Sequence, residues 1–303
     1  MNTTAKLNTR MSTNGEAMID REDTSCRDLY LDLLKKCLVN SIYEDTPAPI
    51  FIDGKSTSQY SSERRSTGRD WPTKAHTMIG LQRLNNLHSL AKKVLTEGIE
   101  GDFLEAGVWR GGATIFMRGL LKAYAVRDRL VWVADSFCGF PPSDKISSRS
   151  YSSPELLTAI NRIEAGDADW KAALETLRTG TTEVDVMTNF ERYGLLDDQV
   201  RFLPGFFSDT LPSAPVKKLA ILRADGDLYD STYQILDNLY PRVTPGGFVI
   251  IDDYHSFTEC RQAVHDYLAA TKPDVQLENI DADAVFWQKR GRGFCETGSE
   301  HLY

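Results

Sequence analysis

Short apolar runs alternate with segments of helical periodicity over the middle and end of the chain, and this alternation constrains the fold more than any other feature. Strands are expected at Phe103–Ala106, Leu130–Ala134, Val200–Leu203, Leu219–Leu222 and Phe248–Ile251. Helices are expected at Thr114–Tyr124, Tyr229–Tyr240 and Cys260–Ala270. Because parallel strands need long crossovers, this order predicts a parallel sheet with helices on both faces, a doubly wound α/β fold.

The ends of the chain and one internal interval depart from this pattern. Val275–Ile280 and Ala284–Trp287 flank a short turn, which predicts an antiparallel edge hairpin. The interval 137–188 is far longer than one crossover helix needs, so we expect an inserted lid over the strand ends. The expected division is a disordered tail at 1–27, an N-terminal helical extension at 28–95, a Rossmann-like domain at 96–290 that contains the insertion, and a C-terminal tail at 291–303.

The N-terminal extension combines two expected helices with a polar connection. Apolar residues from Leu29 to Ile42 approximate helical spacing, and helical periodicity returns over His76–Leu95. Residues 44–71 are rich in Ser, Thr, Asp, Arg and Gly, which predicts a mobile connection rather than a packed element. The first helix is amphipathic and is expected to pack on the main body or on another subunit, so we expect a homo-oligomer, a dimer or higher.

Charge and cysteine content exclude several classes of function. The formal net charge of the 303 residues is −8, and no basic stretch is long enough to bind a nucleic acid. Residues 1–22 lack the apolar core of a signal peptide or membrane anchor, so no membrane partner is expected. The five cysteines form no C-x-x-C pair, which argues against a zinc site or a disulfide framework and for the reducing cytoplasm.

Two acidic clusters each follow a short apolar run. Asp225-Gly226-Asp227 follows Leu219–Leu222, and Asp252-Asp253 follows Gly247–Ile251. Because the carboxyl ends of parallel strands meet at one edge of a sheet, the four carboxylates are expected close together, where a positive charge must offset their repulsion. Oxygen ligands of this kind suit Mg²⁺ better than Zn²⁺. The alternative is that these carboxylates cap helices or face water in loops.

A glycine-rich turn follows the first expected strand and begins a helix. Gly107 lets the turn approach a ligand closely, and Gly111-Gly112 permit tight entry into the helix. Asp135, at the end of the second expected strand, is placed to bind the two hydroxyls of a ribose. The spacing matches neither G-x-G-x-x-G nor a Walker motif. An adenosine-containing cofactor without a pyrophosphate therefore fits better than a dinucleotide or a nucleoside triphosphate.

Several stretches of the chain carry a resemblance to a known family: residues 30–34, 75–80, 105–112, 132–137, 192–205, 225–227 and 251–254. They resemble the macrocin O-methyltransferase family, which uses S-adenosylmethionine and Mg²⁺ to methylate sugar hydroxyls on macrolide and aminocoumarin antibiotics. The resemblance runs from Leu29 to Gln288 and implies a class I methyltransferase with a Rossmann-like sheet. It also implies a sugar or glycoside as substrate, although the long insertion and extended N-terminal tail leave the acceptor open.

The resemblance further implies roles for individual residues. The cofactor-binding residues are Thr77 and Met78 beside the sulfonium, Glu105, Gly107, Val108, Trp109 and Arg110 around the methionine moiety, Asp135 and Ser136 on the ribose, and Gly205, Phe206 and Phe207 beside the adenine. Arg110, at a helix start, would pair with the methionine carboxylate. Core packing is the alternative for Trp109 and for one of Phe206 and Phe207.

The expected chemistry is an in-line displacement in which water is kept out and a sugar hydroxyl loses its proton. We assign Asp227, Asp252 and Asp253 to the metal and Asp225 to the base. Residues two apart on a strand point the same way, so Asp225 as ligand and Asp227 as base is the alternative.

Two competing functions share parts of this pattern. One is a catechol or caffeoyl-CoA type O-methyltransferase acting on an aromatic diol, and the other is a non-catalytic S-adenosylmethionine-binding protein. Four clustered carboxylates argue against the second, because idle buried charges only cost stability.

Overall fold

The computed structural model describes residues 25–48, 51–52, 55–56, 59–140, 147–151, 165–166, 168 and 181–291. Nearly all of the expected tails at 1–27 and 291–303, and most of the expected lid at 137–188, lie outside this part. The N-terminal boundary moves slightly, because helix α1 begins at Cys26 and Ser25 caps it by accepting a hydrogen bond from the Asp28 N–H at 3.2 Å.

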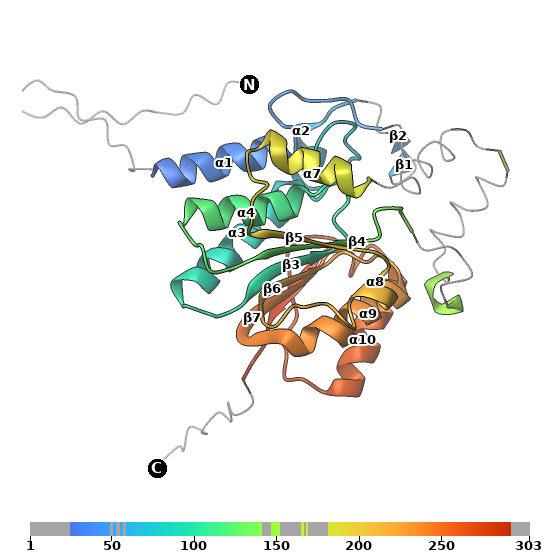
Figure 1. The fold of residues 1–303 in the computed structure, drawn as a ribbon. Helices are drawn as coiled ribbons and strands as arrows, with labels where there is room; N and C mark the ends of the chain where they lie inside the picture. The colour runs from blue at the N-terminus through green and yellow to red at the C-terminus, as the bar shows by residue number, and fades with distance from the viewer. Residues whose placement is uncertain are drawn as a thin grey trace, which may run out of the picture.

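The described residues form a seven-stranded sheet in the order β5-β4-β3-β6-β7-β9-β8 (Figure 1). Its strands are β3 Asp102–Ala106, β4 Val131–Asp135, β5 Val200–Pro204, β6 Leu219–Ala224, β7 Val243–Ile251, β8 Glu278–Asn279 and β9 Val285–Gln288. The first five are parallel, whereas β9 pairs antiparallel with β7 and with β8. The expected doubly wound sheet with an antiparallel edge hairpin is confirmed. A separate two-stranded ladder joins β1 Phe51–Ile52 to β2 Lys55–Ser56.

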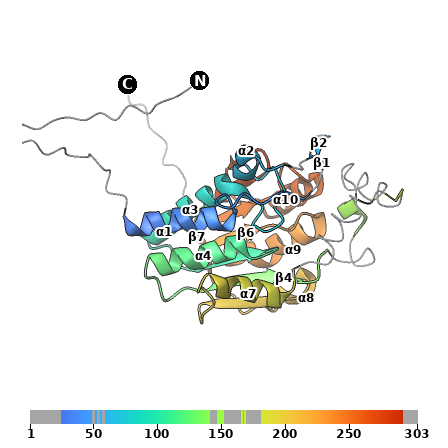
Figure 2. The same cartoon turned by 90° about the horizontal axis from the view of Figure 1, so that it is seen from above.

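Helices cover both faces of this sheet (Figures 1 and 2). The helices on one side are α1 Cys26–Leu38, α3 Gly80–Thr96, α4 Gly112–Ala123 and α7 Glu183–Arg192, and those on the other are α8 Phe207–Thr210, α9 Tyr229–Leu239 and α10 Thr258–Thr271. The short helix α2 Ser62–Ser66 precedes α3, and the 3₁₀ turns are η2 Ser148–Tyr151 and η3 Tyr240–Arg242. Among the described residues, no helix has the length and apolar character that crossing a bilayer requires.

Side chains alternate across the sheet and fill two cores. Phe103 of β3 packs with α1, α3, α4 and α7, whereas its neighbour Leu104 packs with α9 and α10. Burial of each such side chain stabilises the fold by about 1.5–3 kcal/mol. Because both faces are covered, β6 is buried along its whole length, including the charged side chain of Arg223, which is 1% exposed.

The expected mobile connection at 44–71 is wrong for the part that the structure describes. Arg65 in α2 is 1% exposed, and its guanidinium pairs with Asp45 at 2.7 Å and Asp70 at 2.9 Å. It also donates to the Val39 carbonyl at 2.8 Å, at the end of α1. The polar residues that suggested mobility therefore form a buried ion cluster, which fixes this segment against the N-terminal extension because a buried charge must keep its partners.

Candidate active site

The strand ends of the sheet set the geometry of the site. Hydrogen bonding continues one residue beyond the strands: Asp225 N–H donates to the Ala106 carbonyl at 2.8 Å, and Gly107 N–H donates to the Ala134 carbonyl at 2.8 Å. Asp252 N–H likewise donates to the Ala224 carbonyl at 3.0 Å. The residues that follow β3, β6 and β7 are thus held at fixed spacings along one edge, as ligand sites in open α/β sheets are.

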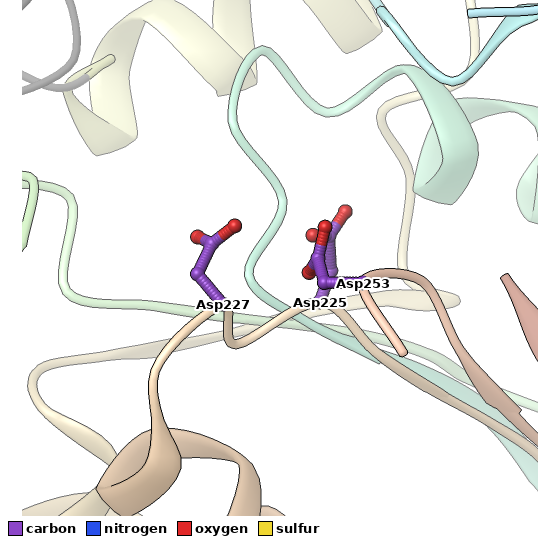
Figure 3. Close-up of side chains that lie close together, drawn as sticks. All are labelled: Asp225, Asp227 and Asp253. Carbon is purple, nitrogen blue, oxygen red and sulfur yellow. The ribbon is translucent and has the colours of Figure 1, made fainter. Parts of the chain in front are cut away.

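Three of the four expected carboxylates come together at this edge. One oxygen from each of Asp225, Asp227 and Asp253 lies within 4.8 Å of the others, and Figure 3 shows the three side chains pointing to the same side, with Asp227 beside the other two. Asp227 has a positive φ of 53°, so the turn after β6 sets its direction instead of strand alternation, and it still points to the same side as Asp225 (Figure 3). The Asp225 side chain is 25% exposed, so a ligand can reach the group.

Burial and mutual repulsion both act on this group. Burial raises the pKa values of Asp225, Asp227 and Asp253, and the neighbouring carboxylates raise them further. Among the described residues, no hydrogen-bond partner reaches the buried oxygen Asp253 Oδ2. Oxygen donors that repel one another and keep a free acceptor fit a hard divalent cation such as Mg²⁺.

Asp252 does not join this group. Its Oδ2 accepts from Arg83 Nη1 at 2.5 Å and its Oδ1 from Arg223 Nη2, and all three side chains are buried. Burial would raise the pKa of Asp252, but the two guanidinium groups outweigh it and lower that pKa. Arg223 also donates to Asp225 Oδ2 at 2.7 Å and to Glu105. Asp252 is therefore joined to the acidic group through a buried arginine.

Glu105 lies below the group rather than open to a ligand. It is 2% exposed, and its Oε1 accepts from Arg223. Burial is the largest cause that raises the pKa of Glu105, to about 8, because the attraction of Arg223 offsets it only in part. The structure thus places Glu105 as a partner of Arg223.

The glycine turn reaches the acidic group directly. Gly107 has φ +88°, and a Cβ built there would lie 1.7 Å from the Asp225 carbonyl oxygen. Asp135 Oδ2 accepts from Val108 N–H at 2.7 Å, and its Oδ1 accepts from Phe137 N–H at 2.9 Å. One carboxylate therefore holds the turn after β3 and the turn after β4. The expected cofactor turn and the expected metal residues are therefore immediate neighbours.

The segment that carries Thr77 and Met78 is bound to the start of α4. The His76 carbonyl accepts from Gly112 N–H at 2.9 Å, and Thr77 is buried beside it. Arg110 Nη1 donates to the carbonyls of Pro72, Thr73 and Ala75 at 3.2, 3.0 and 2.9 Å. Its guanidinium stacks on the neighbouring Trp109 ring, 4.2 Å from the centroid. In the structure Arg110 thus holds this segment, rather than standing free at the helix start.

The remaining expected cofactor residues lie along the same edge. Gly205 has φ +128° and donates its N–H to the Asp135 carbonyl at 2.9 Å, which brings the end of β5 beside that of β4. Phe206 caps α8, while Phe207 packs against the second core, so the core alternative applies to Phe207. Ser136 Oγ donates to the Gly139 carbonyl at 2.7 Å. Ten of the twelve expected cofactor positions therefore fall on the segments that follow β3, β4 and β5 or precede α3, whereas Glu105 lies within β3 and Asp135 is the last residue of β4.

Two functional residues were missed from the sequence. Arg223 had a signal, since an arginine within the apolar run of β6 needs buried acidic partners. Arg83 had none, because it looks like any polar residue of a surface helix, although it is 8% exposed in the first turn of α3.

Comparisons with known proteins agree with this geometry. The chain is 49% identical over 263 residues to the 8-demethyl-8-(2,3-dimethoxy-alpha-L-rhamnosyl)-tetracenomycin-C 4'-O-methyltransferase of Streptomyces olivaceus, covering 86% of this chain and 93% of that protein. It is 48% identical over 263 residues to the mycinamicin III 3''-O-methyltransferase of Micromonospora griseorubida, covering 86% and 96%. It is 46% identical over 269 residues to the demethyldecarbamoylnovobiocin O-methyltransferase of Streptomyces niveus, covering 89% and 96%.

A solved structure and a family profile complete the comparison. The structure of the O-methyltransferase NovP superposes on this chain with a TM-score of 0.74 at 44% sequence identity. The match covers 88% of this chain and 100% of NovP. The profile of macrocin O-methyltransferase (TylF) matches residues 27–289. With relatives this similar over most of both chains, the protein is an O-methyltransferase and belongs to the macrocin O-methyltransferase family.

Proposed function

We propose that this O-methyltransferase transfers a methyl group from S-adenosylmethionine to a sugar or deoxysugar hydroxyl of a glycosylated secondary metabolite, with the help of Mg²⁺. The carboxylate group of Asp225, Asp227 and Asp253, in contact with the glycine turn at Gly107, is the observation that carries it. The sugar acceptor is supported by the relatives, one of which is named for a rhamnosyl-tetracenomycin substrate. Antibiotic biosynthesis is the setting that the same names support.

The chain's own residues divide the work of binding the cation and moving the proton. We assign Asp225 and Asp253 to the cation, because Arg223 fixes Asp225 Oδ2 at 2.7 Å and Asp253 Oδ2 has no other acceptor role among the described residues. A divalent cation held there would supply the positive charge that lowers the pKa of the reacting hydroxyl. Asp227 stands beside these two carboxylates and pairs with no described arginine, so it is the better proton acceptor.

This assignment exchanges the expected roles of Asp225 and Asp227 and removes Asp252 from the expected metal ligands. Asp225 was first assigned as the base, with Asp227 as a ligand, but the ion pair with Arg223 stabilises ionised Asp225 and makes it the weaker base. Asp252 was expected among the ligands, but both of its oxygens accept from arginines. The proposed ligand set therefore keeps Asp225 and Asp253, with Asp227 close enough to complete it before the acceptor enters.

The cofactor is proposed to lie along the ends of β3, β4 and β5. The Gly107–Arg110 turn and Thr77–Met78 would border its methionine end, and Gly205 and Phe206 its adenine. Asp135 accepts from the N–H groups of Val108 and Phe137, and Ser136 Oγ and the Trp109 N–H also lie within reach of its carboxylate. A ribose hydroxyl would therefore take over one of these weaker contacts, for example that of Ser136 at 3.5 Å. This arrangement points the sulfonium methyl toward the acidic group, as an in-line displacement requires.

The first test separates the two aspartate roles. We expect Asp227→Asn to lose turnover at least about 100-fold while Mn²⁺ still binds, because removing a general base costs that much. Asp225→Asn should lose both Mn²⁺ binding and turnover, and both variants should keep S-adenosylmethionine affinity. Electron paramagnetic resonance of Mn²⁺, calorimetry of the cofactor and a product assay measure the three quantities. Lost cofactor binding in either variant would refute these roles.

The second test concerns the acceptor. Deoxysugar glycosides and catechols are offered to the purified enzyme, and the products are identified by mass spectrometry. Methylation of glycosides supports the proposal, whereas turnover of catechols alone would favour an aromatic diol as substrate.

The assembly state and compartment belong to the same proposal. Helix α1 packs Leu31 and Leu34 on the main body but leaves Leu29 and Leu33 exposed by 58% and 54%. These two side chains support a homo-oligomer, which light scattering checks. The described cysteines are all free, as in a cytoplasmic enzyme.

A further inference from the structure

A chain of buried ion pairs leads away from the acidic group of Asp225, Asp227 and Asp253. Arg223 joins Asp225 to Asp252, and Arg83 continues from the other oxygen of Asp252 at 2.5 Å. The side chains of Arg83, Arg223 and Asp252 are exposed by 8%, 2% and 5%. Isolated charges at that depth are unstable, so each member depends on the next.

Arg83 also reaches the turn of the edge hairpin between β8 and β9. Its Nε donates to Asp281 at 2.8 Å and its Nη2 to Asp283 at 2.6 Å, so all three nitrogens have separate acceptors. Asp283 in turn accepts from Ser256 Oγ at 2.8 Å, just after Asp253. One guanidinium thus connects the first turn of α3, the end of β7 and the hairpin.

We propose that Arg83 and Arg223 are internal counter-ions of the acidic site, which hold Asp252 away from the cation and let the chain fold without one. The inference rests on the proposed function for the identity of the site. The two guanidinium groups lie among seven carboxylates and offset part of their repulsion, as a divalent cation would offset a further part: Glu105, Asp225, Asp227, Asp252, Asp253, Asp281 and Asp283.

The proposal predicts the direction in which the stability of the protein changes when Arg83 is removed. Without that guanidinium, Asp252 keeps one buried oxygen unpaired, and the site carries one more uncompensated negative charge. The metal-free protein should therefore become less stable, while a divalent cation should relieve more repulsion than it does in the unmodified protein. Stability becomes dependent on the cation, because a ligand that binds only the folded state stabilises it.

The test compares thermal unfolding of Arg83→Gln and the unmodified protein, with EDTA and with saturating Mg²⁺. We expect Arg83→Gln to lower the Tm by about 6–12 °C in EDTA. Mg²⁺ should raise the Tm of this variant by at least twice the shift that it gives the unmodified protein. Arg118→Gln is the matched control, because Arg118 is equally buried and pairs with Asp197 at 2.6 Å, far from the site; its loss of Tm should not respond to Mg²⁺.

A second variant keeps the test decisive if Arg83→Gln does not fold. Asp281 and Asp283 also lose Arg83, so adding Asp252→Asn removes one of three affected carboxylates, the one joined to the acidic group through Arg223. The double variant should therefore recover part of the Tm and lose the extra Mg²⁺ response. Equal Mg²⁺ responses of Arg83→Gln and Arg118→Gln, or a double variant less stable than Arg83→Gln, would overturn the counter-ion role. Absence of Mn²⁺ binding by the unmodified protein would instead refute the proposed use of Mg²⁺, whatever Arg83→Gln does.

Discussion

Replacing Gly107 by alanine tests whether the cofactor turn and the acidic group form one rigid unit. An alanine at φ +88° costs about 1–2 kcal/mol, because its Cβ approaches its own backbone. Its Cβ would also lie 1.7 Å from the Asp225 carbonyl oxygen, so the Asp225 peptide must shift. That shift stretches the 2.8 Å hydrogen bond from Asp225 N–H to Ala106, worth about 0.5–1.5 kcal/mol, and disturbs the buried pair with Arg223.

Gly107→Ala should therefore lower the free energy of unfolding by at least about 3 kcal/mol. Gly98→Ala is the matched control: Gly98 has φ +66° with nothing within 4 Å of a built Cβ, so it bears only the conformational cost of about 1–2 kcal/mol. Urea unfolding measures the free energies, and Mn²⁺ resonance measures the site. Gly107→Ala should lose Mn²⁺ binding while Gly98→Ala keeps it. Equal unfolding free energies and equal Mn²⁺ affinities for the two variants would refute the reasoning.

Two further predictions concern parts of the fold away from the carboxylates. Burial lowers the pKa of His76 from its ordinary value of 6.5 to about 4. Between these two pH values the unfolded chain therefore binds more protons than the folded protein does. The free energy of unfolding should fall by about 2 kcal/mol as the pH drops through that window, and His76→Asn should remove this part; an unchanged pH profile would contradict it. Gly119 in α4 lies under α1, where a built Cβ would be 2.4 Å from Leu34 Cδ2, so Gly119→Val should cost about 1–3 kcal/mol. Hydrogen exchange should accelerate in α1 but not in α9, and equal acceleration in both would speak against a local effect.

The sheet and its acidic edge could be predicted because their signals are local. Most strands are short apolar runs, and Asp135, Asp225 and Asp253 lie at the ends of such runs or within two residues of them, so strand order alone brings them to one edge. Asp252 shows a limit of that logic: adjacent residues at a strand end point to opposite sides, so Asp252 and Asp253 cannot both face one cation from the same ladder. Strand alternation therefore already predicts that Asp252 and Asp253 do not bind the same cation.

Other features depend on partners distant in sequence. Arg83 finds Asp252 across 169 residues, and no periodicity encodes that pairing. The connection around Arg65 looked mobile because polar residues are common in loops, whereas burial of its guanidinium depends on Asp45 and Asp70 meeting it in space. Asp227 required its backbone conformation, a φ of 53°, before its direction could be known.

The neighbouring positions of β3 and β6 have a consequence for how the protein folds. The chain builds β3, β4 and β5 outward on one side, then returns to place β6 and β7 on the other side of β3. Gly107 and Asp225 therefore belong to two halves that meet along one seam, and Asp253 stands in the second half. Closing that seam is a long-range event, and we predict that it follows the local contacts of each half and the rate-limiting step. A cation held by these carboxylates would then strengthen contacts formed after the rate-limiting step, and so would slow unfolding more than it speeds folding.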